Sequence, residues 1–146
     1  MIEKVLCVCL GNSDRSPMMA AVLKMYLKNV AMGNVFCESA GILEIADKGG
    51  GASPLMINAA KRIGLDLSSH RRRRVDSLEI SRYDLFVCVD DRVAAYILEL
   101  GVDIKNICNA RVSNCWPSQF QRDLDDTAEN IMGAMFRVVT RYFPCE

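Results

Sequence analysis

The sequence predicts a single α/β domain in three layers, in which a twisted, parallel, four-stranded sheet carries helices on both faces. Short apolar stretches alternate with longer helical patterns along the chain. This alternation is typical of βαβ units, which build a parallel sheet covered on both sides. With 146 residues the chain is long enough for one hydrophobic core and too short for two. We therefore expect one domain over residues 1–146.

Strands are expected where Val, Ile, Leu, Phe and Cys concentrate over a few residues. The expected strands are residues 3–9, 34–40, 84–89 and 104–108. Ligands of parallel α/β sheets bind beyond the carboxyl ends of the strands. The loop that follows the first strand, residues 9–15, therefore lies where a binding site is expected.

Helix starts are indicated by two Ser-Pro pairs. Ser16 is the expected N-cap of the first helix, and Pro17 occupies its first helical position, where the missing N–H costs nothing. Ser53 and Pro54 repeat the signal for a second helix, which is expected to end at Gly64. Two further helices are expected at residues 92–100 and 124–143.

Composition excludes several classes of protein. The 18 basic residues balance the 18 acidic ones, so no overall field attracts nucleic acid or a membrane, and neither is an expected partner. No stretch approaches the roughly 18 apolar residues of a membrane span. The seven cysteines lack zinc or CxxC spacing and there is one histidine, so no metal or cofactor is expected. Scattered free cysteines favour a reducing, cytoplasmic location.

Loop 9–15 carries the chemistry. A short loop between a strand and a helix turns main-chain N–H groups inward and forms an anion-binding cradle. Gly11 is expected to permit backbone dihedral angles that a side chain would forbid. The helix dipole and Arg15 favour the thiolate of Cys9, which is the nucleophilic form, and Arg15 matches two phosphoryl oxygens with its planar fork. Ser16 is expected to donate its hydroxyl to the sulfur.

The stretch VCLGNSDRSP, residues 8–17, resembles the V-C-x-G-N-x-C-R-S-P signature of the low-molecular-weight protein tyrosine phosphatases. ESAG at residues 38–41 and YDLFVCVDD at 83–91 are similar to later family segments, and GLDLSSHRRRR at 64–74 resembles G-I-D-[IL]-S-x-H-x-[SA]-R. The resemblance covers residues 2–108. It implies a phosphotyrosine phosphatase I-like fold and a cysteinyl-phosphate intermediate formed without a metal.

The same resemblance assigns roles within the loop. Cys9 would be the nucleophile, Arg15 the phosphate clamp and Ser16 the donor to the thiolate. Asn12 would hold the loop in place. Around them, Leu10, Gly11, Asn12, Ser13 and Asp14 would surround the bound phosphate. The implied substrates are a phosphotyrosine-containing protein or a small aryl phosphate, and inorganic phosphate or another oxyanion would bind in the loop.

Asp14 departs from the family signature, which has a second cysteine just before the arginine. A carboxylate that pointed into the cradle would oppose both the thiolate and the phosphate. At ~4 Å and an effective dielectric constant near 20, such a like-charge pair costs about 4 kcal/mol. Asp14 must therefore face away, be protonated, or serve another purpose.

The general acid is the second departure. The family uses the aspartate of an Asp-Pro pair before the last helix, and this chain contains no Asp-Pro. Alignment on the local proline puts Trp116 in that place, and alignment on the tryptophan puts Phe120 there. Asp123 is the nearest candidate acid. General acids contribute about 10²–10⁴-fold, so the sequence predicts a phosphatase that is slow or confined to good leaving groups.

Several alternatives remain open. Trp116 and Phe120 either form an aromatic wall for a phosphotyrosine ring or pin the loop to the body of the protein. For His70 and residues 71–74, a solvated basic stretch is favoured over one that attracts substrate. Residues 49–51 are the expected flexible part of the loop 41–53. For Asp90, a structural hydrogen-bonding role is favoured over a catalytic one. The chain could also be a phosphatase-like module that binds an anionic partner without turnover, or a thiol-dependent arsenate reductase.

Overall fold

The computed structural model describes residues 1–115 and 118–144. Their sheet has four parallel strands in the order β2-β1-β3-β4, so the first strand lies at its centre. The strands are β1 (Lys4–Cys9), β2 (Phe36–Gly41), β3 (Leu85–Cys88) and β4 (Ile107–Asn109). The predicted four-stranded parallel sheet is confirmed.

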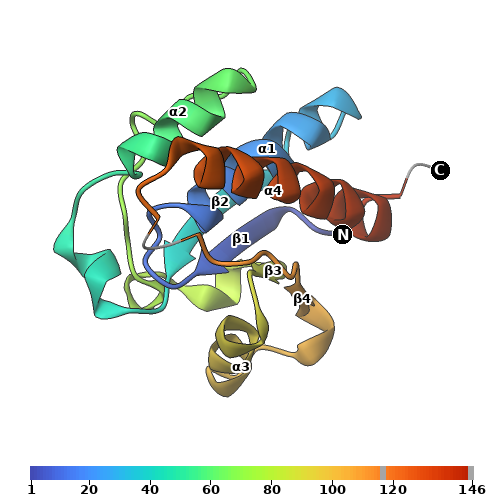
Figure 1. The fold of residues 1–146 in the computed structure, drawn as a ribbon. Helices are drawn as coiled ribbons and strands as arrows, with labels where there is room; N and C mark the ends of the chain where they lie inside the picture. The colour runs from blue at the N-terminus through green and yellow to red at the C-terminus, as the bar shows by residue number, and fades with distance from the viewer. Residues whose placement is uncertain (116–117, 145–146) are drawn as a thin grey trace.

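Helices cover both faces of the sheet, as predicted (Figure 1). One face carries α1 (Arg15–Asn29), α2 (Pro54–Arg62) and α4 (Gln121–Tyr142), with α4 packed against both of the others. The other face carries α3 (Asp91–Glu99), which contacts β3 and β4. The first face therefore carries more of the helices than the second. Loop 9–15 follows β1, one of the inner strands of the sheet.

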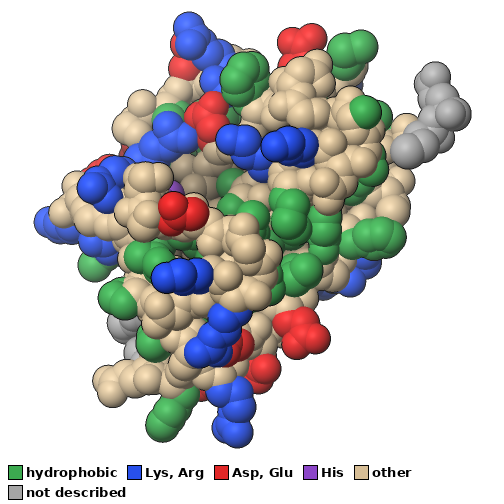
Figure 2. Space-filling model, turned by 90° about the horizontal axis from the view of Figure 1, so that it is seen from above, with side chains coloured by type: hydrophobic (Ala, Val, Ile, Leu, Met, Phe, Trp, Pro, Cys, Tyr) green, Lys and Arg blue, Asp and Glu red, His purple; other side chains and the backbone are tan. Residues whose placement is uncertain are grey.

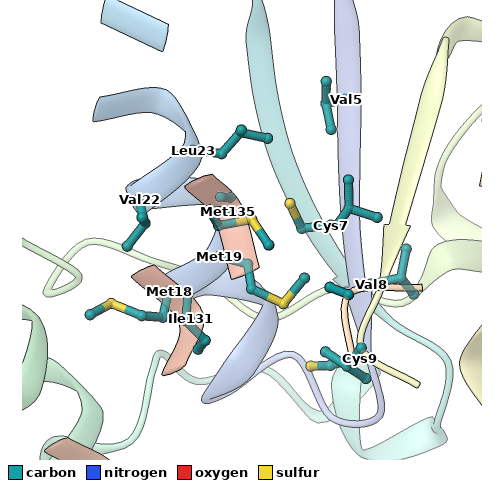
Figure 3. Close-up of a cluster of buried hydrophobic side chains, with 14 of the residues drawn as sticks. Val5, Cys7, Val8, Cys9, Met18, Met19, Val22, Leu23, Ile131 and Met135 are labelled. Carbon is teal, nitrogen blue, oxygen red and sulfur yellow. The ribbon is translucent and has the colours of Figure 1, made fainter. Parts of the chain in front are cut away.

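The core lies between β1 and the helices α1 and α4. Cys7 and Cys9 lie on the side of β1 that faces Met19 and Met135, as Figure 3 shows. Cys7, Met19 and Met135 are completely buried. Because Cys7 and Cys9 lie two residues apart on a strand, they share one face, and Cys7 is part of the apolar packing there.

Two predicted elements begin elsewhere. The expected strand at residues 104–108 is only Ile107–Asn109, because Asp103 caps a short 3₁₀ turn by accepting a hydrogen bond from the Lys105 N–H at 3.0 Å. The first helix begins at Arg15 with Asp14 in the N-cap position, so the prediction of Ser16 as N-cap is wrong. The Ser53 prediction is confirmed, since its side chain accepts a hydrogen bond from the Met56 N–H.

The surface carries both signs of charge. Lys and Arg side chains are interspersed with Asp and Glu on the face drawn in Figure 2, in line with the formal net charge of zero. Within residues 1–115 and 118–144, no helix is long and apolar enough to cross a membrane.

Candidate active site

Loop 9–15 connects the central strand to α1 and is held around Cys9. The Cys9 thiol is 3% exposed, and its sulfur accepts a hydrogen bond from the Asn12 main-chain N–H at 3.2 Å. The Ser16 hydroxyl lies 2.9 Å from the same sulfur. Two polar hydrogens can thus converge on Sγ, which stabilises negative charge there. The first-turn N–H groups of α1 have no intrahelical partner and lie at this end of the loop.

Asn12 is the internal brace of the loop. It is completely buried, and its φ of 58° is left-handed, a conformation that Asn tolerates better than most residues. Its amide nitrogen donates to Ser16 Oγ at 2.8 Å and to Ser39 Oγ at 3.0 Å, and its oxygen accepts from the Arg73 N–H at 3.0 Å. The left-handed residue of the loop is therefore Asn12, and Gly11 does not have a positive φ.

Ser16 contributes a side chain rather than a cap. Besides Sγ, its hydroxyl has the Ala40 carbonyl at 3.3 Å as a second acceptor. Since Asn12 donates to the Ser16 oxygen, the hydroxyl proton is free to point toward Cys9. Hydrogen bonds can thus run from the buried Asn12 amide through the Ser16 hydroxyl to the Cys9 sulfur.

Arg15 lines the same hollow as Cys9 and has little freedom. The residue is 3% exposed, and its guanidinium donates to the Val112 carbonyl at 2.8 Å. Asp90 lies 3.7 Å from the same Nη1 atom and also caps α3 by accepting from the Val93 N–H at 3.0 Å. Asp90 thus makes a structural hydrogen bond of the kind predicted, and the pair of acceptors orients the guanidinium.

Asp14 accepts a hydrogen bond from the Ser53 hydroxyl at the start of α2. Ser53 in turn donates its main-chain N–H to the Ser13 carbonyl at 3.2 Å. Of the three possibilities for Asp14, the structure favours recruitment to another purpose, because the carboxylate links the loop to α2.

The end of β2 must be glycine for loop 9–15 to pack on it. A Cβ atom at Gly41 would lie 2.6 Å from the Leu10 carbonyl oxygen and 3.0 Å from the Asn12 nitrogen. Such contacts are shorter than a real Cβ makes, so any other residue would push the loop outward. Gly41 also donates its N–H to the Arg73 carbonyl at 2.9 Å.

A hollow of about 470 Å³ opens over the loop. Loop residues 9–11 and 13–15 line it, so Leu10, Gly11, Ser13 and Asp14 lie where a bound phosphate was expected. Asn12 is completely buried and does not line the hollow. The lining also includes Leu43, Ile45, Arg92 and Asn114, which the sequence analysis did not single out for the site. Arg72 lines it too, and comes from the basic stretch for which attraction of the substrate was the less favoured alternative.

The candidates for the general acid lie apart from this hollow or outside the description. Asp123 is in the first turn of α4, where its carboxylate accepts a hydrogen bond from the Ser118 hydroxyl at 2.6 Å, and it is not one of the residues lining the hollow. Phe120 is 72% exposed. Trp116 lies outside the described residues.

Burial opposes ionisation of five other thiols. Burial raises the pKa of Cys7 well above its usual value, that of Cys37 to about 11 and that of Cys88 to about 12. Burial also raises the pKa of Cys108 and Cys115. Among residues 1–115 and 118–144, no cluster of three His, Cys, Asp or Glu side chains could hold a metal ion.

A cysteine at the end of a central parallel strand, cradled by a loop and an arginine at a helix start, defines an oxyanion-binding thiol protein. Comparison with known sequences makes this class specific. The family model described as low molecular weight phosphotyrosine protein phosphatase matches residues 4–130. The chain belongs to this family.

The individual relatives include a phosphatase and an arsenate reductase. The chain is 36% identical over 90 residues to a probable low molecular weight protein-tyrosine-phosphatase, EpsP, of Ralstonia nicotianae, over 62% of this chain and 57% of that protein. It is 39% identical over 80 residues to an arsenate reductase of Brevibacillus brevis, over 55% of this chain and 53% of that protein. The chain thus spans little more than half the length of these two relatives.

The fold has close counterparts among solved structures. Wzb of Vibrio vulnificus, solved in complex with benzylphosphonate, superposes with a TM-score of 0.84 and 20% identity, over 97% of this chain and 99% of that chain. The same three-layer fold is therefore present over nearly the whole length.

Proposed function

We propose that this chain hydrolyses phosphotyrosine in proteins, and small aryl phosphates, through a phosphate ester of Cys9. The observation that carries the proposal is the buried Cys9 sulfur, which faces the Asn12 N–H and the Ser16 hydroxyl in a hollow that the fixed Arg15 also lines. Family membership and the phosphatase relatives support it. Wzb, which shares the fold, binds a benzylphosphonate, an analogue of an aryl phosphate.

The reaction has two displacements at phosphorus. In the first, the Cys9 thiolate forms an S–P bond while the bond from phosphorus to the tyrosyl oxygen breaks, and the leaving oxygen takes a proton. In the second, water attacks phosphorus, the S–P bond breaks and inorganic phosphate leaves. Arg15 and the loop N–H groups hold the phosphoryl oxygens throughout, and Ser16 stabilises the sulfur as it leaves.

The proton for the leaving group is the weak point of this site. Asp123 stays the candidate acid, and a shift of the residues before α4 would be needed to bring it to the hollow. We therefore propose an enzyme whose rate depends steeply on the leaving group. A reducing, cytoplasmic setting suits a free nucleophilic thiol.

Hydrolysis of p-nitrophenyl phosphate and of phenyl phosphate tests this proposal. We expect an initial burst with the first substrate, abolished by Cys9→Ser and retained by Cys37→Ser. Phenyl phosphate, with its poorer leaving group, should be hydrolysed about 10²-fold or more slowly, as expected where acid assistance is weak. Equal rates on both would show an efficient acid, and Asp123→Asn would then identify or dismiss Asp123.

A non-catalytic binding module is the second candidate, favoured by the absence of an Asp-Pro pair. Tight vanadate binding without turnover of either ester would support it. A thiol-dependent arsenate reductase needs resolving cysteines in a mobile segment after the third strand. This likeness carries less weight here, because Cys88 lies within β3, and Cys88 and Cys108 are buried with raised pKa values.

A further inference from the structure

We propose that Arg72 and Arg92 form a second anion subsite at the mouth of the hollow, which binds an acidic side chain next to the phosphotyrosine of a peptide. The inference rests on the proposed function and extends it to the class of substrate. Both arginines line the same hollow as Cys9 and Arg15, although they come from distant parts of the chain.

Neither guanidinium is neutralised. The ion pairs of the described residues engage Arg15, Arg62, Arg73, Arg74 and Arg82, and none involves Arg72 or Arg92. The Nε atom of Arg72 is buried and has no hydrogen-bond partner among the described residues. A buried, unpaired donor is costly, so a ligand that supplies an acceptor to it would bind more favourably.

Arg72 is also held in place by its surroundings. Its main-chain N–H donates to the Gly50 carbonyl at 2.9 Å, and a Cβ atom at Gly50 would lie 2.5 Å from its guanidinium nitrogen. Gly50 has a φ of 91°, a conformation that side chains rarely adopt. The glycine run therefore packs against the basic segment, residues 71–74, rather than serving only as a flexible part of the loop.

Arg72 departs from the family pattern. In the resemblance to G-I-D-[IL]-S-x-H-x-[SA]-R, Arg73 matches the final arginine and Arg72 stands where the pattern has Ser or Ala. Arg73 is fully engaged with Glu38 and Ser39, at 2.8 and 3.0 Å. The guanidinium of Arg72, in contrast to that of Arg73, forms no ion pair with any described residue and is available to a ligand.

The walls of the hollow suggest how a substrate lies. Leu43 and Ile45 offer an aliphatic surface for the ring of a phosphotyrosine whose phosphate is on the loop. Residues that flank the tyrosine then pass the part of the lining that Arg72 and Arg92 form. A carboxylate there would form charge-assisted hydrogen bonds with planar guanidinium groups.

Peptide binding in a Cys9→Ser background tests the subsite without depending on turnover. Two phosphotyrosine peptides are compared, one with Glu on each side of the phosphotyrosine and one with Gln there. We expect about tenfold tighter binding of the acidic peptide, an advantage that Arg72→Ala reduces severalfold and Arg92→Ala lowers as well. Ala at residue 72 matches the family pattern, so this variant should fold.

Control variants separate a local subsite from general charge. Arg137→Ala removes an exposed arginine on α4 and should leave the preference unchanged. Arg72→Glu should reverse the preference toward a peptide with Lys at the flanking positions. In the Cys9 protein, Arg72→Ala should raise KM for the acidic peptide and leave kcat within about twofold.

Equal affinity for the Glu and Gln peptides, with turnover of both by the Cys9 protein, would overturn the subsite and leave the proposed function standing. An acidic preference that Arg137→Ala reduces as much as Arg72→Ala would also overturn it. Failure of both peptides to bind or be hydrolysed would overturn the proposed function, and the subsite with it.

Discussion

His70 ties loop 9–15 to the basic segment. Its Nε2 atom lies 2.8 Å from the Asn12 carbonyl oxygen, so the neutral ring with a proton on Nε2 donates to the loop. Burial lowers the pKa of His70, the hydrogen bond to Asn12 opposes this, and the neighbouring Arg73, Arg71 and Arg72 lower it further. The histidine is therefore neutral in the folded protein over a pH range in which the unfolded chain binds a proton.

Because the folded pKa lies below the unfolded value of 6.5, the contribution of His70 to stability is complete above pH 6.5. It is lost progressively as the pH falls below that value and through the folded pKa. We expect the free energy of unfolding, measured by urea titration from pH 7.5 downward, to decrease first in this window. His70→Gln should remove this part of the decrease, and an identical pH profile for the variant would contradict the account.

At the scale of elements, one link between two helix starts stabilises the site. Ser53 accepts from the Met56 N–H at the start of α2 and donates to Asp14 in the N-cap position of α1. The side chain therefore both caps one helix and holds the carboxylate that precedes the other. This double role explains how an acidic residue is accommodated next to an oxyanion site.

Ser53→Ala should lower the free energy of unfolding by about 0.5–2 kcal/mol, the usual range for loss of an N-cap, and should also weaken vanadate binding because Asp14 loses its donor. Urea denaturation and vanadate titration measure the two effects. Ser81→Ala, which removes an exposed hydroxyl, is the matched control. Loss of stability with unchanged vanadate affinity would mean that Asp14 does not depend on Ser53.

The two Ser-Pro pairs show where sequence reasoning succeeds and fails at this scale. The same signal is correct at Ser53 and wrong at Ser16, because the Ser16 hydroxyl is committed to the Cys9 sulfur and the Asn12 amide. The helix consequently begins earlier, at Arg15. Local cap preferences describe a helix on its own, and a tertiary network of hydrogen bonds overrides them here.

Over the whole molecule, the parts of the site differ in how well the sequence predicts them. The loop with Cys9 and Arg15 is contiguous and follows a recognisable strand, so its place at the sheet edge could be predicted. Arg72 and Arg92 reach the same hollow only through the folding of distant segments. Their spacing along the chain does not indicate that they share a hollow. The run of arginines at residues 71–74 favoured the prediction of a solvated stretch.

The account depends on a reactive Cys9 thiolate inside an oxyanion site. Its most direct test is alkylation by iodoacetate at pH 6.5, mapped to individual cysteines by mass spectrometry with and without inorganic phosphate. Since burial suppresses ionisation of Cys7, Cys37 and Cys88, we expect Cys9 to be modified ahead of these thiols and to be protected by phosphate. Modification of Cys9 no faster than these buried thiols, or at a rate that phosphate does not change, would contradict it.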